Sequence, residues 1–154
     1  MSGASGLQIL AAAESDIQIL QALFVASSMS NEGDRANMVE HPEVLVFDGE
    51  GVSEGRTRVA VDDGEIVGFS TYVVAPDFME VEDLFVQPGR MRGGVGRALI
   101  GDLVEIARSK SAPYLEVTAN PHALEFYEAV GFVAGESVET QFGPGIRMRM
   151  VVAS

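Results

Sequence analysis

The residues between Gly89 and Arg97 are the part of the sequence whose types and spacing most clearly favour ligand chemistry. This stretch holds four glycines and three arginines, and no Asp or Glu occurs between Asp83 and Asp102. Glycines let the backbone approach a ligand closely, and the first turn of a following helix offers unpaired N–H groups and partial positive charge. The sequence therefore predicts an anion site suited to phosphate.

Two common phosphate-binding loops do not fit this stretch. A Walker loop ends in Gly-Lys-Ser/Thr, and no such triplet follows the glycines. A dinucleotide-binding loop belongs to an alternating βαβ pattern, whereas this loop follows an antiparallel meander of predicted strands. Taken alone, the stretch is also compatible with a flexible turn whose arginines aid solubility. A nucleotide-phosphate binder of another fold would need Walker or ribose-binding acids, which we do not find.

Residues 86–100, with the sequence VQPGRMRGGVGRALI, resemble the acyl-CoA loop of the GNAT superfamily of N-acetyltransferases. In that family a strand ending in V-x-P precedes a Q/R-x-x-G-x-G/A loop and an apolar helix. Gly94 and Gly96 take the positions of the two glycines, and Met91 takes the Q/R position. Met91 departs from the pattern and removes a side-chain donor. The departure leaves the backbone N–H groups in place, and a neighbouring arginine could replace the lost charge.

Residues 115–132, with the sequence LEVTANPHALEFYEAVGF, are similar to the second signature of that family: a strand, an Asn, an Ala, an F-Y pair and then G-F. The resemblance implies an α/β protein with the GNAT-like acyl-CoA N-acyltransferase fold. Its central mixed sheet would be mostly antiparallel, splayed at the cofactor cleft, with helices on both faces. We expect one domain over residues 1–154, with residues 1–6 as a tail.

The resemblance further implies acetyl-CoA as the co-substrate, no metal, and direct attack of an amine on the thioester. The pantetheine arm would pair with the backbone of the strand before the glycine loop, and the pyrophosphate would bind the loop itself. Asn120 would contact the pantetheine arm or serve as a plain helix cap. The residues implied in cofactor binding are Leu84, Phe85, Val86, Met91, Arg92, Gly93, Gly94, Val95, Gly96, Arg97, Asn120 and Tyr127.

Tyr127 occupies the Tyr position of the family, which implies that it protonates the departing thiolate as a general acid. Its alternative role is a half-buried aromatic ring that anchors the helix. For the general base we rank Glu82 and Glu116 first, on the two strands that carry the base in some family members, with Glu80 behind them. Glu80 and Glu82 share one strand face, so together they would attract a cationic amine. Each carboxylate is also compatible with a solvated position on a strand.

The composition narrows the classes of partner. The 154 residues include 23 acidic and 10 basic side chains, which give a net charge of −13, and there is no Cys. This charge disfavours nucleic acid and anionic membranes as partners, and the lack of Cys excludes disulfides and thiol chemistry. The sequence has neither the pattern of a signal peptide nor an apolar run long enough to span a membrane, so we expect a cytoplasmic protein. Residues 89–97 carry +3 and the rest −16, which favours a cationic amine as the acceptor.

Two questions stay open in the sequence. A non-catalytic acyl-CoA-binding sensor or interaction module would keep the glycine loop without needing an acid or a base, and it is the alternative function. The closing strand over residues 146–152 is apolar enough to allow a homodimer.

Changes in hydrophobic period predict the elements that must position these residues. We expect strands over residues 7–12, 56–61, 66–74, 78–86, 113–118, 132–135 and 146–152, with a turn at residues 143–145. Helices are expected from about residue 17 to 28, over 31–40, over 95–109, and over 121–130 with Pro121 as first residue and Asn120 as N-cap.

Overall fold

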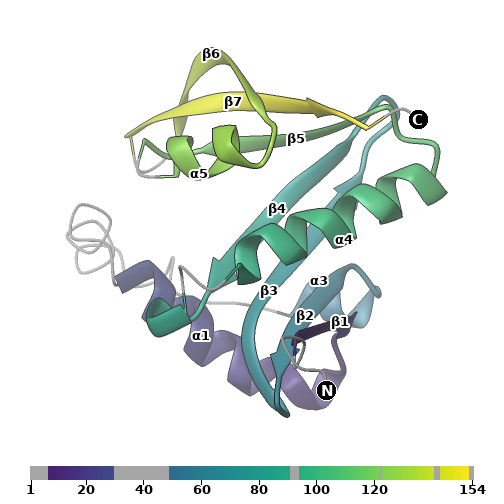
Figure 1. Ribbon diagram of the computed structural model, residues 1–154, viewed down its shortest axis with the longest axis vertical. Coiled ribbons are helices and arrows are strands. Elements are labelled where there is room, and N and C mark those ends of the chain that lie inside the picture. The colour runs from purple at the N-terminus through teal and green to yellow at the C-terminus, as the bar shows by residue number, and fades with distance from the viewer. Residues whose placement is uncertain (1–6, 30–48, 91–93, 122, 141–142, 153–154) are drawn as a thin grey trace. The chain divides into compact units, whose positions relative to one another are not determined.

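The computed structural model describes residues 7–29, 49–90, 94–121, 123–140 and 143–152 (Figure 1). The strands are β1 (Leu7–Ala11), β2 (Thr57–Asp62), β3 (Glu65–Val74), β4 (Met79–Val86), β5 (Tyr114–Ala119), β6 (Val133–Thr140) and β7 (Gly143–Val151). The α-helices are α1 (Ile17–Met29), α3 (Glu50–Ser53), α4 (Val95–Ser109) and α5 (Leu124–Ala129). Short 3-10 helices cover Glu14–Asp16 and Pro88–Arg90.

The described strands form one mixed sheet in the order β1-β2-β3-β4-β5-β7-β6. Pairing is antiparallel between β1 and β2, β2 and β3, β5 and β7, and β6 and β7. Strands β4 and β5 pair in parallel. The predicted α/β class with a mixed, mostly antiparallel sheet is confirmed.

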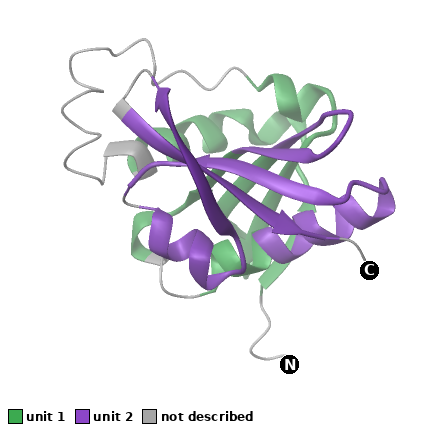
Figure 2. Ribbon diagram, turned by 90° about the horizontal axis from the view of Figure 1, so that it is seen from above, with its two compact units in different colours: residues 1–71, 83–99 green, residues 72–82, 100–154 purple. Residues whose placement is uncertain are grey.

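The chain divides into two compact units, coloured separately in Figure 2. Unit 1 comprises residues 1–71 and 83–99, and unit 2 comprises residues 72–82 and 100–154. Strands β3 and β4 and helix α4 each contribute residues to both units.

Helices cover both faces of the sheet in unit 1, as expected. The α1 side has a buried cluster of Leu20, Leu23, Val52, Val59 and Phe69, and the α4 side has one of Ala60, Val67, Val95 and Leu99. Val59 and Ala60 are successive residues of β2 and point to opposite faces, because side chains alternate along a strand. A hydrogen bond between the buried hydroxyls of Thr57 and Thr71, 2.9 Å long, lies within the same unit.

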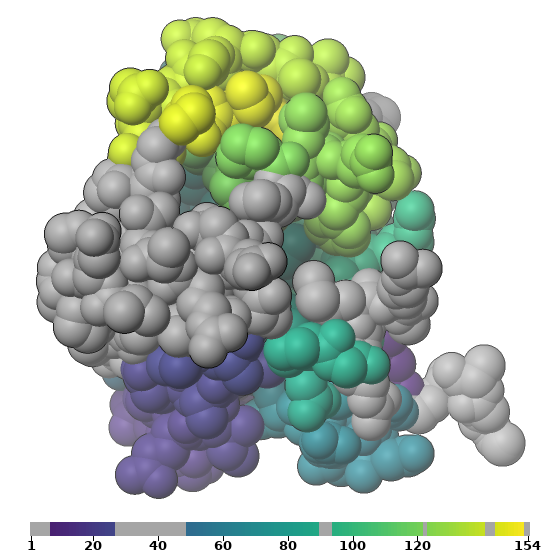
Figure 3. All heavy atoms as spheres, turned by 90° about the vertical axis from the view of Figure 1, so that its left-hand side faces the viewer, coloured from purple at the N-terminus to yellow at the C-terminus, as the bar shows by residue number. Residues whose placement is uncertain are grey.

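The apolar interior of unit 2 is built on β5. Leu115, Val117 and Ala119 are at most 4% exposed. Other buried apolar side chains of the unit are Leu103, Ala107, Tyr127, Phe132 and Met148. Strands β6 and β7 form a continuous surface of this unit (Figure 3).

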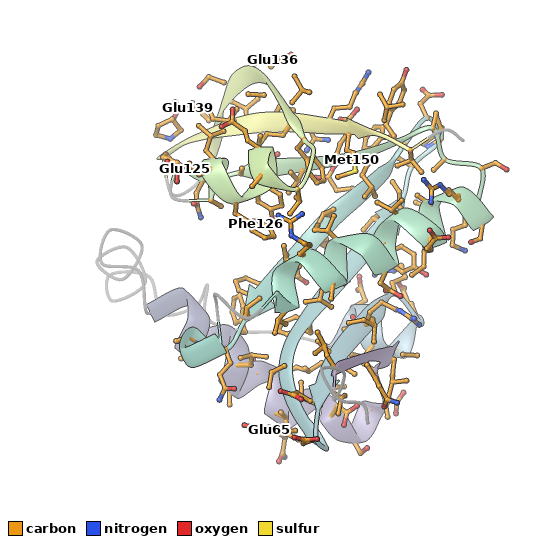
Figure 4. All side chains as sticks on the ribbon, in the orientation of Figure 1. Glu65, Glu125, Phe126, Glu136, Glu139 and Met150 are labelled. Atoms are coloured by element: carbon orange, nitrogen blue, oxygen red, sulfur yellow. The ribbon has the colours of Figure 1, made fainter. Side chains whose placement is uncertain are left out.

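Strand β6 lies at the edge of the sheet, and all but one of its residues are exposed. Its register with β7 shifts between Ala134 and Ser137, and it carries Glu136 and Glu139 (Figure 4). Irregular register and charged side chains protect an edge strand from pairing with another chain.

Three predicted boundaries near the C-terminus are wrong. Helix α5 begins at Leu124, so Pro121 is not its first residue. Strand β6 runs on to Thr140 instead of ending near residue 135. Residues 143–145 form no turn and belong to β7, where they pair with residues 138–140 of β6. A Cβ on Gly145 would lie 2.9 Å from Thr118 Cγ2. Glycine is needed there for close packing between strands. The predicted helix over residues 31–40 lies outside the described residues.

Candidate functional site

The N-terminus of α4, in unit 1, has the geometry of an anion site. Gly94 precedes the helix with φ +84°, a left-handed conformation that favours glycine, and nothing would lie within 4 Å of a Cβ there. The N–H of Ala98 donates to the Gly94 carbonyl oxygen at 3.0 Å. The N–H groups of Val95, Gly96 and Arg97 come before this bond and have no acceptor within the helix. These donors lie at the positive end of the helix dipole, where an anion is stabilised.

The charge around this helix end also favours an anion. No acidic residue occurs in the first turn of α4, and Arg97 is exposed. Met91, Arg92 and Gly93, the other predicted loop residues, lie outside the described residues.

Gly68 and a β-bulge in β3 allow α4 to approach the sheet in unit 1. Ala60 pairs with Gly68 and Val61 pairs with Ile66, so Val67 is an extra residue in β3. The bulge leaves Gly68 facing α4, where an added Cβ would lie 2.9 Å from Val95 Cγ1. The start of α4 thus packs closely on the β3 backbone.

The side chains at the end of β4 are part of the core, as the sequence analysis expected. Leu84 and Val86 pack against the α4-side cluster, and Phe85 packs on the α1-side cluster. The Phe85 ring lies 5.1 Å from the Phe24 ring and 5.5 Å from the Phe69 ring, centroid to centroid. The side chains of these three β4 residues are therefore committed to the core.

Tyr127 lies in unit 2 and is 6% exposed. Its ring makes edge contacts with Phe126 at 5.1 Å and Phe132 at 5.3 Å, centroid to centroid (Phe126 is labelled in Figure 4). Burial raises the pKa of the Tyr127 hydroxyl above its ordinary value of 10.0, because desolvation disfavours the phenolate. The hydroxyl therefore keeps its proton at neutral pH and is able to donate it.

Asn120 closes the turn between β5 and α5. Its side-chain oxygen accepts the N–H of Ala123 at 2.9 Å, and its carbonyl oxygen accepts the same N–H at 3.0 Å. The capping interaction expected of Asn120 is present, but it stabilises the turn before the helix, whose N-cap is Ala123.

Glu116 is 7% exposed and ion-paired to two arginines of β7. Arg147 Nη2 donates to its Oε1 at 2.8 Å, and Arg149 donates to its Oε2 from Nε at 2.9 Å and from Nη2 at 2.5 Å. Both carboxylate oxygens thus already accept guanidinium hydrogen bonds.

The other two candidate bases on β4 lie in different surroundings. Glu80 forms a bidentate ion pair with Arg147, with N–O distances of 2.6 and 2.8 Å. Glu82 is exposed. The structure therefore brings Glu80 together with Glu116, its partner in the parallel register of β4 and β5. Glu80 and Glu82 lie two residues apart on β4 and so share a strand face.

Arg147 and Arg149 were not among the residues predicted from the sequence to form the site. Two arginines at alternate positions of a predicted strand, in a chain of net charge −13, were the available signal. They share a strand face, and a neighbouring strand in an acidic chain is expected to offer carboxylates to both.

The described residues contain neither a group of metal-binding side chains nor a helix suited to cross a membrane. No group of three or more His, Cys, Asp or Glu side chains that could hold a metal ion occurs in the described part of the chain. No helix among the described ranges combines the length and apolar character needed to cross a bilayer.

Residues 21–132, which are 112 of the 154 residues, match the Acetyltransferase (GNAT) family. The chain belongs to this family. The two motifs at residues 86–100 and 115–132 therefore identified the GNAT family correctly, and the match takes in the strand, the glycines and the Tyr that carried the resemblance.

Two curated relatives of this GNAT-family chain are acetyltransferases. It is 38% identical over 80 residues to a glucosamine 6-phosphate N-acetyltransferase of Trypanosoma brucei brucei, covering 47% of this chain and 54% of the relative. It is 38% identical over 108 residues to a streptothricin acetyltransferase of Streptomyces lavendulae, covering 59% of this chain and 57% of the relative. The chain thus spans just over half the length of each curated relative.

The fold is shared with solved GNAT structures. The paiA N-acetyltransferase of Thermoplasma acidophilum, solved with coenzyme A, matches with a TM-score of 0.76 and 14% identity, covering 98% of this chain and 99% of that one. At this identity the likeness concerns the fold.

Proposed function

We propose that the chain is an N-acetyltransferase that moves an acetyl group from acetyl-CoA to a primary amine. The single observation that carries the proposal is the start of α4. There a left-handed Gly94 and three N–H groups that have no acceptor within the helix follow a strand whose side chains are committed to the core. Membership of the GNAT family gives this anion site its ligand.

In this proposal the backbone binds the donor. The N–H groups of Val95, Gly96 and Arg97 bind the pyrophosphate of acetyl-CoA, and the exposed Arg97 adds positive charge. The backbone of residues 84–86 pairs with the pantetheine arm. The coenzyme A bound to a structural relative supports this choice of donor.

The reaction is direct attack of a neutral amine on the thioester carbon. The C–N bond forms, the C–S bond breaks, and the amine proton passes to a base while the CoA thiolate takes a proton. Tyr127 acts on the departing sulfur: burial keeps its hydroxyl protonated, so it donates a hydrogen bond to the thiolate and supplies its proton as general acid. The CoA thiol is a stronger acid than an unperturbed tyrosine, which makes it a good leaving group.

Glu82 is the better base of the two ranked first. A general base must be within reach of the substrate amine, directly or through water. Glu116 is 7% exposed and its oxygens accept hydrogen bonds from Arg147 and Arg149, whereas the Glu82 side chain is exposed on β4. We therefore assign Glu82 to proton removal and Glu116 to the structure around it.

The acceptor is a primary amine of a small molecule or of a protein. One curated relative is named for acetyl transfer to glucosamine 6-phosphate, which supports a small amine. The net charge of −13 favours an acceptor that is cationic before it loses its proton, since long-range attraction concentrates opposite charge near the protein.

A thiol-release assay with acetyl-CoA and a panel of amines tests the proposal. We expect turnover with at least one amine, and a loss of about 10²- to 10⁴-fold in kcat for Tyr127→Phe with little change in acetyl-CoA affinity. The phenylalanine keeps the ring contacts with Phe126 and Phe132, so the variant isolates the hydroxyl.

Calorimetric titration of acetyl-CoA separates the alternatives. Binding without turnover on any amine would favour the non-catalytic sensor. Absence of binding would refute both functions.

A further inference from the structure

Helix α1 exposes an apolar face in unit 1. Its sequence, IQILQALFVASSM, contains no charged residue. Leu20 and Leu23 lie in the core on one side of the helix, whereas Ile19 is 50% exposed. On the edge strand β1, Leu10 is 48% exposed. A surface helix normally carries polar or charged side chains on the face turned to water, so an apolar face of this kind indicates a binding surface.

A groove, called here the α1 groove, lies between α1 and the strands of unit 1. It holds about 770 Å³, within the range of about 300–1,000 Å³ that small-molecule sites occupy. One wall is made by Ile19, Ala22, Leu23 and Ala26, whose spacing of three and four residues places them on one helix face. The other wall comes from β1, β2 and the start of β3. All apolar side chains that line it are aliphatic.

The strand wall of the α1 groove follows from the register of β1, β2 and β3. Leu10 is opposite Val59, and paired residues of antiparallel strands point to the same face. Val61 is opposite Ile66, and both pack against the cluster on the α1 side. Helix α4 packs on the other face of the same sheet, against Ala60. The sheet of unit 1 therefore separates the α1 groove from the helix that carries the anion site.

The charged side chains of the α1 groove favour a cation. The two that line it, Asp16 and Glu65, are both acidic, and no Lys, Arg or His is among the described residues of its lining. Asp16 Oδ2 accepts the N–H of Ala13 at 2.9 Å, which fixes this carboxylate directly before α1. Glu65 is exposed at the start of β3 (labelled in Figure 4). Next to apolar surface, a carboxylate attracts positive charge more strongly than it does in bulk water.

Gln87 adds a hydrogen-bond acceptor to the α1 groove. Its side-chain oxygen Oε1 is buried and accepts no hydrogen bond from the described residues. Its backbone N–H donates to the Val67 carbonyl oxygen at 2.8 Å, which holds residue 87 beside β3. A buried acceptor without a donor is unfavourable, so a ligand that brings an N–H to this amide would be stabilised. The α1 groove thus combines aliphatic surface, two carboxylates and an acceptor that lacks a donor.

We propose that the α1 groove is a second ligand site of this protein and that it takes an aliphatic amine as its ammonium ion. The hydrocarbon part lies between the α1 wall and the strand wall, and the ammonium group lies among the acidic side chains of the rim. No covalent step takes place there. The proposal does not depend on the proposed function, because no step of the acetyl transfer uses a residue of this groove.

Titration with n-hexylammonium, in the absence of acetyl-CoA, tests the site. The methyl NMR signals of Leu10, Ile19 and Val61 report where the probe binds, since these side chains line both walls. n-Hexanol and n-hexanoate carry the same hydrocarbon chain with no charge and with a negative charge. We expect hexylammonium to shift these signals and to bind about tenfold more tightly than hexanol, with hexanoate weaker still. Raising the ionic strength should reduce the advantage of the ammonium probe, because salt screens the carboxylates.

Ala22→Leu fills the α1 groove from its helix wall. Ala22 is exposed and leucine is a good helix former, so the variant should fold. We expect its affinity for hexylammonium to fall by about tenfold or more, because the added side chain occupies the space of the probe. Gln18→Leu is the matched control. It adds the same side chain to α1 at an exposed position outside the groove, and its affinity should equal that of the wild type.

Asp16→Asn/Glu65→Gln removes both charges of the α1 groove and keeps its shape. The asparagine retains an oxygen that accepts the Ala13 N–H. We expect the affinity for hexylammonium to fall to that of hexanol, while the affinity for hexanol stays unchanged. This variant therefore separates the charge of the site from its apolar surface.

Four outcomes would overturn the inference. They are equal affinity for the three probes, methyl shifts confined to residues outside the groove, unchanged hexylammonium binding in folded Ala22→Leu, and a dimer in sedimentation that Ala22→Leu dissociates, which would assign the groove to a second copy of the chain. Acetyl transfer provides the last check. We expect kcat and KM of Ala22→Leu to match the wild type, and loss of turnover together with binding would place the groove in the acceptor site and refute a second site. Absence of turnover in a wild type that binds hexylammonium in the groove would refute the proposed function and support this inference.

Discussion

Replacing Gly68 with alanine places a methyl group where helix α4 packs on strand β3. The new Cβ would lie 2.9 Å from Val95 Cγ1, 3.0 Å from the Phe85 carbonyl oxygen and 3.3 Å from Leu99 Cδ1. A side-chain methyl could rotate away, but the Phe85 carbonyl belongs to the backbone of β4. The substitution therefore forces α4 or β4 to move by several tenths of an ångström.

The expected cost follows from the number and rigidity of these contacts. Overpacking a core typically costs about 1–3 kcal/mol, and the backbone contact favours the upper part of that range. For a chain of this size, that corresponds to a fall in Tm of roughly 2–12 °C. The movement also displaces the first turn of α4, so acetyl-CoA affinity should fall by about tenfold or more, since 1.4 kcal/mol is a factor of ten.

Gly101→Ala is the matched control for Gly68→Ala. Gly101 lies within α4, is exposed, and would have nothing within 4 Å of an added Cβ. Alanine there should stabilise the protein by about 0.5–1 kcal/mol, because glycine is the poorer helix former. Urea unfolding and acetyl-CoA titration of both variants provide the test. The packing argument is refuted if Gly68→Ala is as stable as the wild type and binds acetyl-CoA equally well.

Three further changes are expected to have measurable effects. Gly94→Glu should abolish acetyl-CoA binding in a folded protein, because it places an anion at the helix N-terminus and a side chain at φ +84°, a strain of about 1–2 kcal/mol; unimpaired binding by calorimetry would move the site elsewhere. Thr57→Val should cost about 1–3 kcal/mol in urea unfolding by leaving the buried Thr71 hydroxyl without its partner, and Thr57→Val/Thr71→Val should recover part of the loss. Burial raises the pKa of Tyr127, so its contribution to stability is complete below pH 10 and is lost as pH rises further; the stability of the wild type relative to Tyr127→Phe should therefore fall above pH 10, and a constant difference would contradict this.

The sequence was sufficient to predict most of the fold because its periods are clear where packing is simple. Helix α4 was placed correctly at both ends, since its apolar stripe begins directly after the glycines and ends at Ser109. Strands β1 to β4 were each placed to within one residue, because alternating side chains and Asp-Gly or Pro-Asp turns separate them.

The wrongly predicted boundaries lie at glycine and proline residues, where contacts beyond the local sequence decide the structure. Gly143, Pro144 and Gly145 have turn composition, yet they lie in β7 and pair with β6 at residues 138–140. The reason is the closeness of Thr118 and Thr140 side chains to Gly145, which no local pattern records. Pro121 failed as a helix start for a similar reason, because Asn120 bonds Ala123 and closes a turn first.

Some residues of the candidate site could be predicted from contiguous motifs, whereas the contacts of others depend on strands that are far apart in the sequence. Gly94 and Tyr127 belong to contiguous motifs, so their positions followed from the sequence and the family resemblance. The state of Glu116 depends on Arg147 and Arg149, which lie some thirty residues later and meet it through the register of β5 and β7. The register of β5 and β7 is needed to see that the Glu116 carboxylate accepts hydrogen bonds from both arginines.

The arginines of β7 also change the meaning of the acidic composition. The charge of −13 suggested that carboxylates on β4 and β5 attract a cationic amine. Two of those carboxylates, Glu80 and Glu116, are balanced by Arg147 and Arg149, so these four side chains together carry no net charge. Local attraction for the amine must therefore come from carboxylates outside this group.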